Sequence, residues 1–204
     1  RGLIILYLCL GDKRYLEAVS KAYQVLLRHQ TEYMGVSNWI GEGRYEGKME
    51  ELQKTGMYTE GGCGSTDWLA LNCWLWRVTG ETHYLDQAEM VLFNSLMGHQ
   101  ERYGGWCCYS FKPYNMIKPL IRDVYWCCNQ WGALGYTIAL EFAYVTDYDA
   151  ALVNFYLPGK VTLQTEYGPL VLEVDTDYPN SGNVKLTILE SPELPIKLYF
   201  RVPF

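Results

Sequence analysis

Apolar residues recur every three or four positions through most of the first 147 residues, which is the period of an α-helix that buries one face. This period predicts two long amphipathic helices. Their apolar faces are formed by Leu16, Val19, Tyr23 and Leu26 in the first and by Leu85, Ala88, Leu92 and Leu96 in the second. The segments before them, 3–10 and 66–79, are apolar on most sides. We therefore expect helix pairs in which one helix is covered on both faces.

The two helix pairs form an internal repeat. Residues 11–17 (GDKRYLE) match residues 80–86 (GETHYLD), an offset of 80 − 11 = 69 residues. The amphipathic helices are predicted to end at His29 and His99, where each histidine would cap the last turn. A third long helix follows from Cys128 to Val145. A repeat of this length is typical of helix pairs that stack or close into a ring, so we expect part of an α/α toroid.

Near Asp147 the hydrophobic period changes from helical to two. Four strands are predicted, with alternating apolar residues at Val161/Leu163, Leu170/Leu172/Val174, Val184/Leu186/Ile188 and Ile196/Leu198/Phe200/Val202. Turn residues separate them at the spacing of an antiparallel β-sandwich. We therefore predict a partial toroid over 1–147 and a partial β-sandwich over 148–204. Both chain ends fall inside a predicted element, so we expect an internal fragment.

Composition excludes several classes of protein. The 204 residues are 49% hydrophobic, which predicts a globular chain. The net charge is −6 and Lys and Arg do not cluster, which argues against a nucleic-acid partner. No apolar run approaches the roughly 20 residues that a membrane span needs. The cysteine count is seven, with adjacent pairs at 107–108 and 127–128, which argues against a disulfide framework and favours the cytoplasm.

Two long loops, 34–58 and 103–126, each lead toward a helix and carry the candidate chemistry. Glu60 and Cys63 lie three residues apart on a glycine-rich approach, and Cys127 and Cys128 lie at the start of the next helix. A helix N-terminus favours the thiolate form of cysteine. Three sulfurs and one oxygen form a four-ligand set of the kind that tetrahedral zinc takes. The alternative is an ordinary helix start, capped by Ser65 or Thr66, and buried inert cysteines.

Several motifs together resemble glycoside hydrolase family 127. They are the order Glu60 then Cys63 before a helix, the hairpin 79–85, Trp126-Cys127-Cys128 before the next helix, and the segments 154–158 and 173–179. The resemblance implies an (α/α)6 toroid followed by β-sandwich modules, acting as a retaining β-L-arabinofuranosidase on an oligosaccharide or glycoconjugate. It also implies a zinc-bound cysteine nucleophile, a thioglycosyl intermediate and a glutamate that serves as acid and base.

The resemblance implies a role for individual residues of this chain. Glu60, Cys63, Cys127 and Cys128 would bind Zn²⁺, and Cys127 would also be the nucleophile. Glu42, which follows a glycine, would be the acid/base residue, with Glu46 as its rival. The aromatic residues that we expect to contact sugar are Trp39, Tyr45, Trp106 and Tyr109. Trp68 is a further aromatic candidate that could equally belong to the helical core.

Two other classes of function stay open at this point. One is a non-catalytic carbohydrate-binding or structural relative, in which Cys63, Cys127 and Cys128 only pack. The other is a lyase or epimerase on the same toroid, with tyrosine and glutamate as acid/base groups and no covalent thiolate step. Cys107-Cys108 is interpreted as loop packing. The sequence does not specify the linkage or the oligomeric state.

Overall fold

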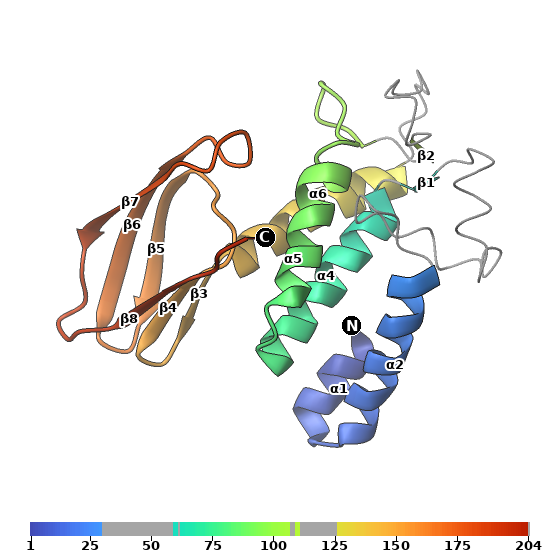
Figure 1. Cartoon of the computed structure of the whole chain (residues 1–204), viewed down its shortest axis with the longest axis horizontal. Helices are drawn as coiled ribbons and strands as arrows, with labels where there is room; N and C mark the ends of the chain where they lie inside the picture. Colours follow the sequence, from blue (N-terminus) through green and yellow to red (C-terminus); the bar gives the residue numbers. More distant parts are fainter. Residues whose placement is uncertain (30–58, 61, 107–108, 111–125, 204) are drawn as a thin grey trace. The chain divides into compact units, whose positions relative to one another are not determined.

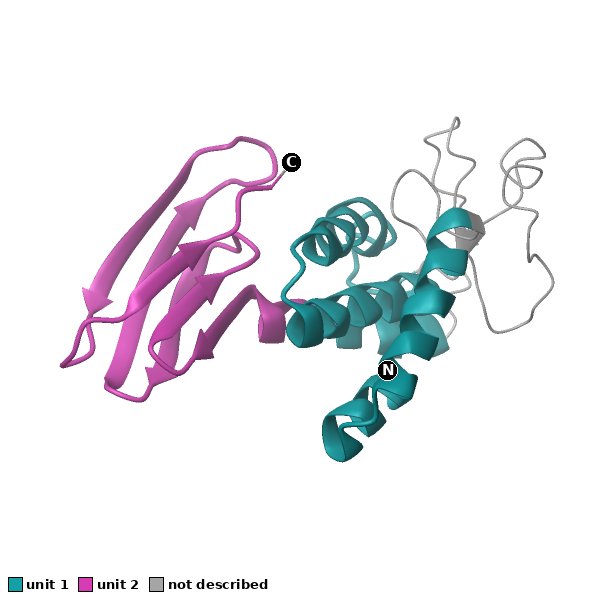
Figure 2. Ribbon diagram, turned by 60° about the horizontal axis from the view of Figure 1, so that its bottom comes forward, with its two compact units in different colours: residues 1–136 teal, residues 137–204 magenta. Residues whose placement is uncertain are grey.

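The computed structural model of the chain describes residues 1–29, 59–60, 62–106, 109–110 and 126–203. The chain divides into two compact units, unit 1 over 1–136 and unit 2 over 137–204 (Figure 2). Unit 1 is mainly helical, and unit 2 consists of the last turns of one helix and six strands. The predicted order of helices followed by sheet is therefore confirmed. None of the helices in the described ranges is long and apolar enough to cross a membrane.

Unit 1 contains both predicted helix pairs (Figure 1). Its elements are α1 (Gly2–Leu10), α2 (Lys13–His29), β1 (Thr59–Glu60), α4 (Gly62–Thr79), α5 (His83–Met90), the π-helical turn η2 (Val91–Leu96), β2 (Tyr109–Ser110) and the first part of α6 (Trp126–Ala143). Each pair turns at a glycine with positive φ, 68° at Gly11 and 75° at Gly80. Their N–H groups donate to the carbonyls of Tyr7 and Trp76 at 2.8 and 2.7 Å. The repeat in sequence is therefore a repeat in backbone conformation.

Aromatic residues join the two helix pairs. The ring of Tyr23 on α2 stacks on Trp68 of α4, with centroids 5.0 Å apart, and meets the edge of Tyr84 on α5. The Tyr23 hydroxyl donates to Oδ1 of Asn72 at 3.0 Å. Trp68 is only 1% exposed. Trp68 is therefore a core residue in the described structure, which is one of its two predicted roles.

Two predicted helix boundaries are wrong. Helix α4 begins at Gly62, so Ser65 and Thr66 lie inside the helix and do not cap it. Helix α6 ends at Ala143, so Val145 belongs to a strand. The end of α6 is fixed by Asn154, whose side-chain amide donates to the Phe142 carbonyl at 2.9 Å and whose N–H donates to that of Ala143 at 2.8 Å. Such distant caps cannot be read from the local pattern.

Unit 2 contains two three-stranded sheets. The strands are β3 (Tyr144–Asp147), β4 (Ala150–Val153), β5 (Gly159–Thr165), β6 (Gly168–Thr176), β7 (Val184–Glu190) and β8 (Lys197–Phe200), in the orders β3-β4-β8 and β5-β6-β7. The four predicted strands are present, whereas β3 and β4 were not predicted, because Val145 also fits the end of the preceding helical stripe. Three of the four pairings in these sheets are antiparallel, but β8 lies parallel to β4, which corrects the all-antiparallel expectation.

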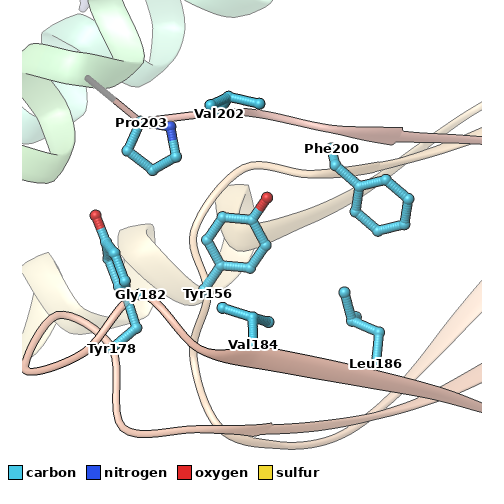
Figure 3. Close-up of a pocket in the computed structure, with 8 residues that line it drawn as sticks. All are labelled: Tyr156, Tyr178, Gly182, Val184, Leu186, Phe200, Val202 and Pro203. Atoms are coloured by element: carbon cyan, nitrogen blue, oxygen red, sulfur yellow. The ribbon is translucent and has the colours of Figure 1, made fainter.

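The two sheets of unit 2 share one core. Ala151 of β4 packs with Leu163, Leu170 and Leu172 of β5 and β6, and Leu198 of β8 packs against this cluster. Beside the core lies an open hollow of about 560 Å³ (Figure 3). It is lined by Tyr156, Tyr178, Gly182, Val184, Leu186, Phe200, Val202 and Pro203. This lining is apolar apart from the tyrosine hydroxyls and carries no carboxylate or thiol, so the hollow lacks the groups of the predicted hydrolase chemistry.

We expect unit 2 to lose stability in alkali through Tyr144. Its hydroxyl donates to the Leu157 carbonyl at 2.6 Å, and burial raises its pKa from 10.0 to about 12. The unfolded chain then loses this proton first, so the stabilisation is complete below about pH 10 and is lost as the pH rises toward about 12. Urea unfolding of wild type and Tyr144→Phe across this range should show the wild-type advantage shrinking. Parallel pH profiles would contradict the assignment.

Candidate metal centre

Three cysteine thiols from two helices meet at one point. Cys63 is the second residue of α4, and Cys127 and Cys128 are the second and third residues of α6. The Sγ atom of Cys128 lies 3.8 Å from that of Cys63 and 4.0 Å from that of Cys127. All three sulfur atoms lie within 4.8 Å of one another. Residues 65 positions apart in the chain are thus brought together, as the sequence predicted for these three ligands.

The first turns of α4 and α6 approach each other closely at this centre (Figure 1). A Cβ atom on Gly62 would lie 2.7 Å from Cβ of Cys128 and 2.8 Å from its Cα and its carbonyl oxygen. Real Cβ atoms do not approach other heavy atoms so closely, so only glycine allows this contact. Gly62 therefore lets the two helix N-termini touch, and this places Cys63 beside Cys128.

Buried polar contacts hold both first turns to the rest of unit 1. On α4, the hydroxyl of Ser65 contacts that of Ser95 in η2 at 2.5 Å. Nδ1 of His99 lies 2.6 Å from the Ser95 carbonyl, which bears out the predicted role of His99 at the end of its helix. On α6, the side-chain oxygen of Asn129 accepts the N–H of Trp106 at 2.7 Å. Residues adjacent to the cysteines are therefore fixed from outside their own helices.

The spacing of the sulfur atoms fits a tetrahedral metal ion. Two thiolates bound to one zinc at about 2.3 Å lie about 3.8 Å apart when the geometry is tetrahedral. The two measured separations, 3.8 and 4.0 Å, are close to this value and well beyond the roughly 2.05 Å of a disulfide. Cys63, Cys127 and Cys128 are not joined by disulfide bonds in the described structure. Three thiols in this arrangement fit zinc with one position left for a fourth ligand.

The pKa of Cys127 does not follow the expectation for a helix N-terminus. Burial raises the pKa of its thiol above the ordinary value, and the neighbouring Cys128 thiol adds to the rise, while a contact with Cys63 lowers it in part. The predicted thiolate character from the helix dipole alone is therefore wrong. Three thiols so close together repel one another as anions, so a cation is the group that would favour their ionised form.

The other predicted site residues are only partly described. The backbone of Glu60 pairs with that of Tyr109 in the β1–β2 ladder, directly before α4, whereas their side chains lie outside the described residues. Glu42, Glu46, Trp39 and Tyr45 also lie outside them, as does the Cys107-Cys108 pair. The predicted roles of these residues stay predictions. The ladder does bring the Tyr109 backbone beside Glu60, close in sequence to Cys63.

Trp106 is a packing residue in the described structure. It is 5% exposed, and its indole N–H donates to the Leu96 carbonyl at 2.9 Å. Its ring lies against Gly132, where a Cβ would come within 2.1 Å of it, and meets the edge of Tyr136. The sugar contact predicted for Trp106 is therefore not what its described surroundings provide, because the ring is covered by α6. Sequence offered no signal for this, since aromatic residues serve cores and sugar sites alike.

Residues 1–137 match the family of the β-L-arabinofuranosidase GH127 catalytic domain, and residues 150–204 match the GH127 middle domain. No protein among the curated sequences matches the chain. Solved structures share its fold. A GH127 β-arabinofuranosidase has a TM-score of 0.75 at 21% identity over 99% of this chain.

Two further solved structures agree with this comparison. A GH127 β-L-arabinofuranosidase from Geobacillus stearothermophilus T6 has a TM-score of 0.74 at 19% identity over 98% of the chain, and a glycoside hydrolase has 0.73 at 21% over 99%. The chain spans 32%, 34% and 38% of the three proteins, about a third of each. The two domain matches lie in the order catalytic then middle. The chain therefore belongs to glycoside hydrolase family 127 and contains part of its catalytic domain followed by part of its middle domain.

Proposed function

We propose that the protein containing this chain is a retaining glycoside hydrolase that acts on β-L-arabinofuranosides. The observation that carries the proposal is the cluster of Cys63, Cys127 and Cys128, within 4.8 Å, in a chain of this family. We further propose that unit 1 is the C-terminal part of an (α/α)6 toroid and unit 2 the start of a β-sandwich. The repeated helix pairs and the core shared by two sheets support these architectures.

In this proposal the three cysteines and Glu60 hold a zinc ion. When bound, zinc would supply the positive charge that keeps the thiols deprotonated despite their crowding. Cys127 is the partly exposed member of the vicinal pair, whereas Cys128 is fully buried. Burial suits Cys128 to a purely ligating role, and exposure suits Cys127 to the role of nucleophile.

The proposed reaction has two displacements at the anomeric carbon. In the first, a bond forms between Sγ of Cys127 and the anomeric carbon while the glycosidic C–O bond breaks, and Glu42 gives its proton to the departing oxygen. In the second, Glu42 takes a proton from water, the water oxygen bonds to the anomeric carbon, and the C–S bond breaks. Two inversions retain the configuration. Glu46 is the rival for the acid/base role.

Two alternative functions make different demands on the thiols. A non-catalytic relative would use the cysteines only for packing, and sulfur atoms in van der Waals contact lie at separations similar to those observed. A lyase or epimerase would use oxygen acids and bases and form no bond to sulfur. The match to the GH127 catalytic domain favours the hydrolase over both alternatives.

The covalent step gives the sharpest test. The protein is incubated with an aryl β-L-arabinofuranoside, quenched in acid and digested, and the peptides are analysed by mass spectrometry. We expect release of the aryl alcohol and a peptide carrying Cys127 with one added arabinosyl group, both absent from Cys127→Ser. Turnover that persists in Cys127→Ser would support the lyase or epimerase alternative. Absence of zinc from the purified wild type, together with three freely titrating thiols, would support the packing alternative.

A further inference from the structure

A second contact between α4 and α6 lies one turn beyond the thiols. Thr66 of α4 is completely buried, and its hydroxyl donates to the carbonyl of Trp131 in α6 at 2.7 Å. Threonine hydroxyls inside helices usually bond to a carbonyl one turn back in the same helix. Thr79 near the end of α4 does so, donating to the Leu75 carbonyl at 2.8 Å. Thr66 instead forms its bond across the helix interface.

The surroundings of Thr66 leave little room for another arrangement. A Cβ on Gly135, one turn after Trp131, would lie 2.6 Å from the Thr66 hydroxyl oxygen and equally close to Leu96. The α4–α6 interface is therefore close at two levels, Gly62 against Cys128 and Thr66 against the turn from Trp131 to Gly135. Glycine makes the approach possible at both levels, and the directional hydrogen bond of Thr66 adds a polar contact that favours one axial register of α4 against α6.

The hydrogen bond of Thr66 is directional and lies near the thiols on both helices. Thr66 is three residues after Cys63, and Trp131 is three residues after Cys128. Within a helix this separation is about one turn, or roughly 5 Å, over which the backbone is stiff. A change in axial register at the hydrogen bond would therefore move Sγ of Cys63 relative to Sγ of Cys128 by a similar amount.

We propose that Thr66 is a positioning residue, whose hydrogen bond to the Trp131 carbonyl sets the register of α4 against α6 and so the spacing of Cys63 from Cys127 and Cys128. This inference rests on the proposed metal centre. Thr66 touches no metal ligand atom in the described structure, and it acts through the two helices. The proposed role belongs to the Thr66 hydroxyl, and an isosteric valine would remove this hydroxyl while keeping a methyl group in its place.

The experiment compares Thr66→Val and Thr66→Ser with wild type. Zinc affinity is measured by competition with a chromophoric chelator, and the site geometry by the visible absorption of the cobalt(II)-loaded protein. We expect Thr66→Val to weaken zinc binding by about 10- to 100-fold, the usual effect of removing a group that orients metal ligands, and to alter the cobalt spectrum. Thr66→Ser keeps the hydroxyl and should restore both the affinity and the spectrum.

Thr79→Val is the matched control. It removes a hydroxyl from the same helix, but the lost bond is internal to α4 and more than three turns from the thiols. We expect it to leave the zinc affinity and the cobalt spectrum at their wild-type values. Circular dichroism of each variant checks that α4 and α6 are retained.

The outcomes separate this inference from the proposed function. If wild type binds zinc and Thr66→Val binds it equally well with the same cobalt spectrum, the positioning role is wrong while the metal centre stands. If Thr66→Ser fails as Thr66→Val does, the volume of the side chain rather than its hydroxyl matters, and the inference is also wrong. If wild type itself binds no zinc, the proposed metal centre fails first.

Discussion

Replacing Cys128 by serine is expected to lower the zinc affinity of this chain by about 100-fold or more. Structural zinc sites with four ligands are worth roughly 10–16 kcal/mol, so one thiolate contributes about 3 kcal/mol, which is roughly a factor of 100 in affinity. Cys128 is the central ligand candidate, because its sulfur lies 3.8 Å from that of Cys63 and 4.0 Å from that of Cys127. The measurement is a chelator competition on the purified protein.

Cys9→Ser provides the control for this substitution. Cys9 is a free, exposed cysteine on α1, so the same chemical change there removes no sulfur from the cluster. It should leave zinc affinity unchanged and lower the count of reactive thiols by one. In wild type, loading with zinc should protect Cys63, Cys127 and Cys128 from alkylation. Alkylation of all three at equal rates with and without zinc is the result that would rule out the metal centre.

The helix pairs could be predicted because their signals are local and repeated. Gly11 and Gly80 each follow an apolar helix and precede an acidic residue, and each adopts positive φ at the turn. The strands β5 to β8 could likewise be predicted, from the alternation of apolar residues. The strands β3 and β4 could not be predicted, since Val145 fits the end of a helical stripe as well as a strand. The helix ends before Val145 because the side-chain amide of Asn154, nine residues after Val145, donates to the Phe142 carbonyl.

The ligand types of the site could be predicted, whereas the packing that places them could not. Adjacent cysteines at a helix start suggested a metal, and the structure brings Cys63, Cys127 and Cys128 together. Nothing local marks Gly62 or Thr66 as interface residues, because each looks like an ordinary part of a helix start. The contact of Gly62 with Cys128 joins residues 66 positions apart and that of Thr66 with Trp131 joins residues 65 positions apart, and such pairings depend on the fold of the whole unit.

The direction of the Cys127 pKa shift also depends on packing that the sequence does not show. A helix N-terminus alone would lower the pKa of a thiol there. Burial and the neighbouring Cys128 thiol reverse the direction by raising the pKa of Cys127, although the contact with Cys63 lowers it in part. The sequence shows the adjacency of Cys127 and Cys128 but not the position of Cys63. Burial of thiols raises their pKa with or without a metal, so the direction of the shift reports the packing of the cluster.

A single methyl group at Gly62 should separate the two halves of the site. In Gly62→Ala the new Cβ would lie 2.8 Å from backbone atoms of Cys128, which cannot rotate away as a side chain can. The first turns of α4 and α6 must then move apart, at a cost of about 1–3 kcal/mol in the free energy of unfolding. Cys63 lies next to the new side chain, so its sulfur moves away from that of Cys128. We expect zinc binding to weaken in parallel with the loss of stability.

Gly2→Ala is the matched substitution at an open position, because nothing lies within 4 Å of a Cβ on Gly2. Alanine favours a helix over glycine by roughly 0.5–1 kcal/mol, so this control should keep or slightly raise the stability. Urea unfolding measures the stability of both variants, and chelator competition measures their zinc affinity. Wild-type zinc affinity in Gly62→Ala would mean that the two helix starts can separate without disturbing the thiols, and the close approach would then have no part in forming the metal centre.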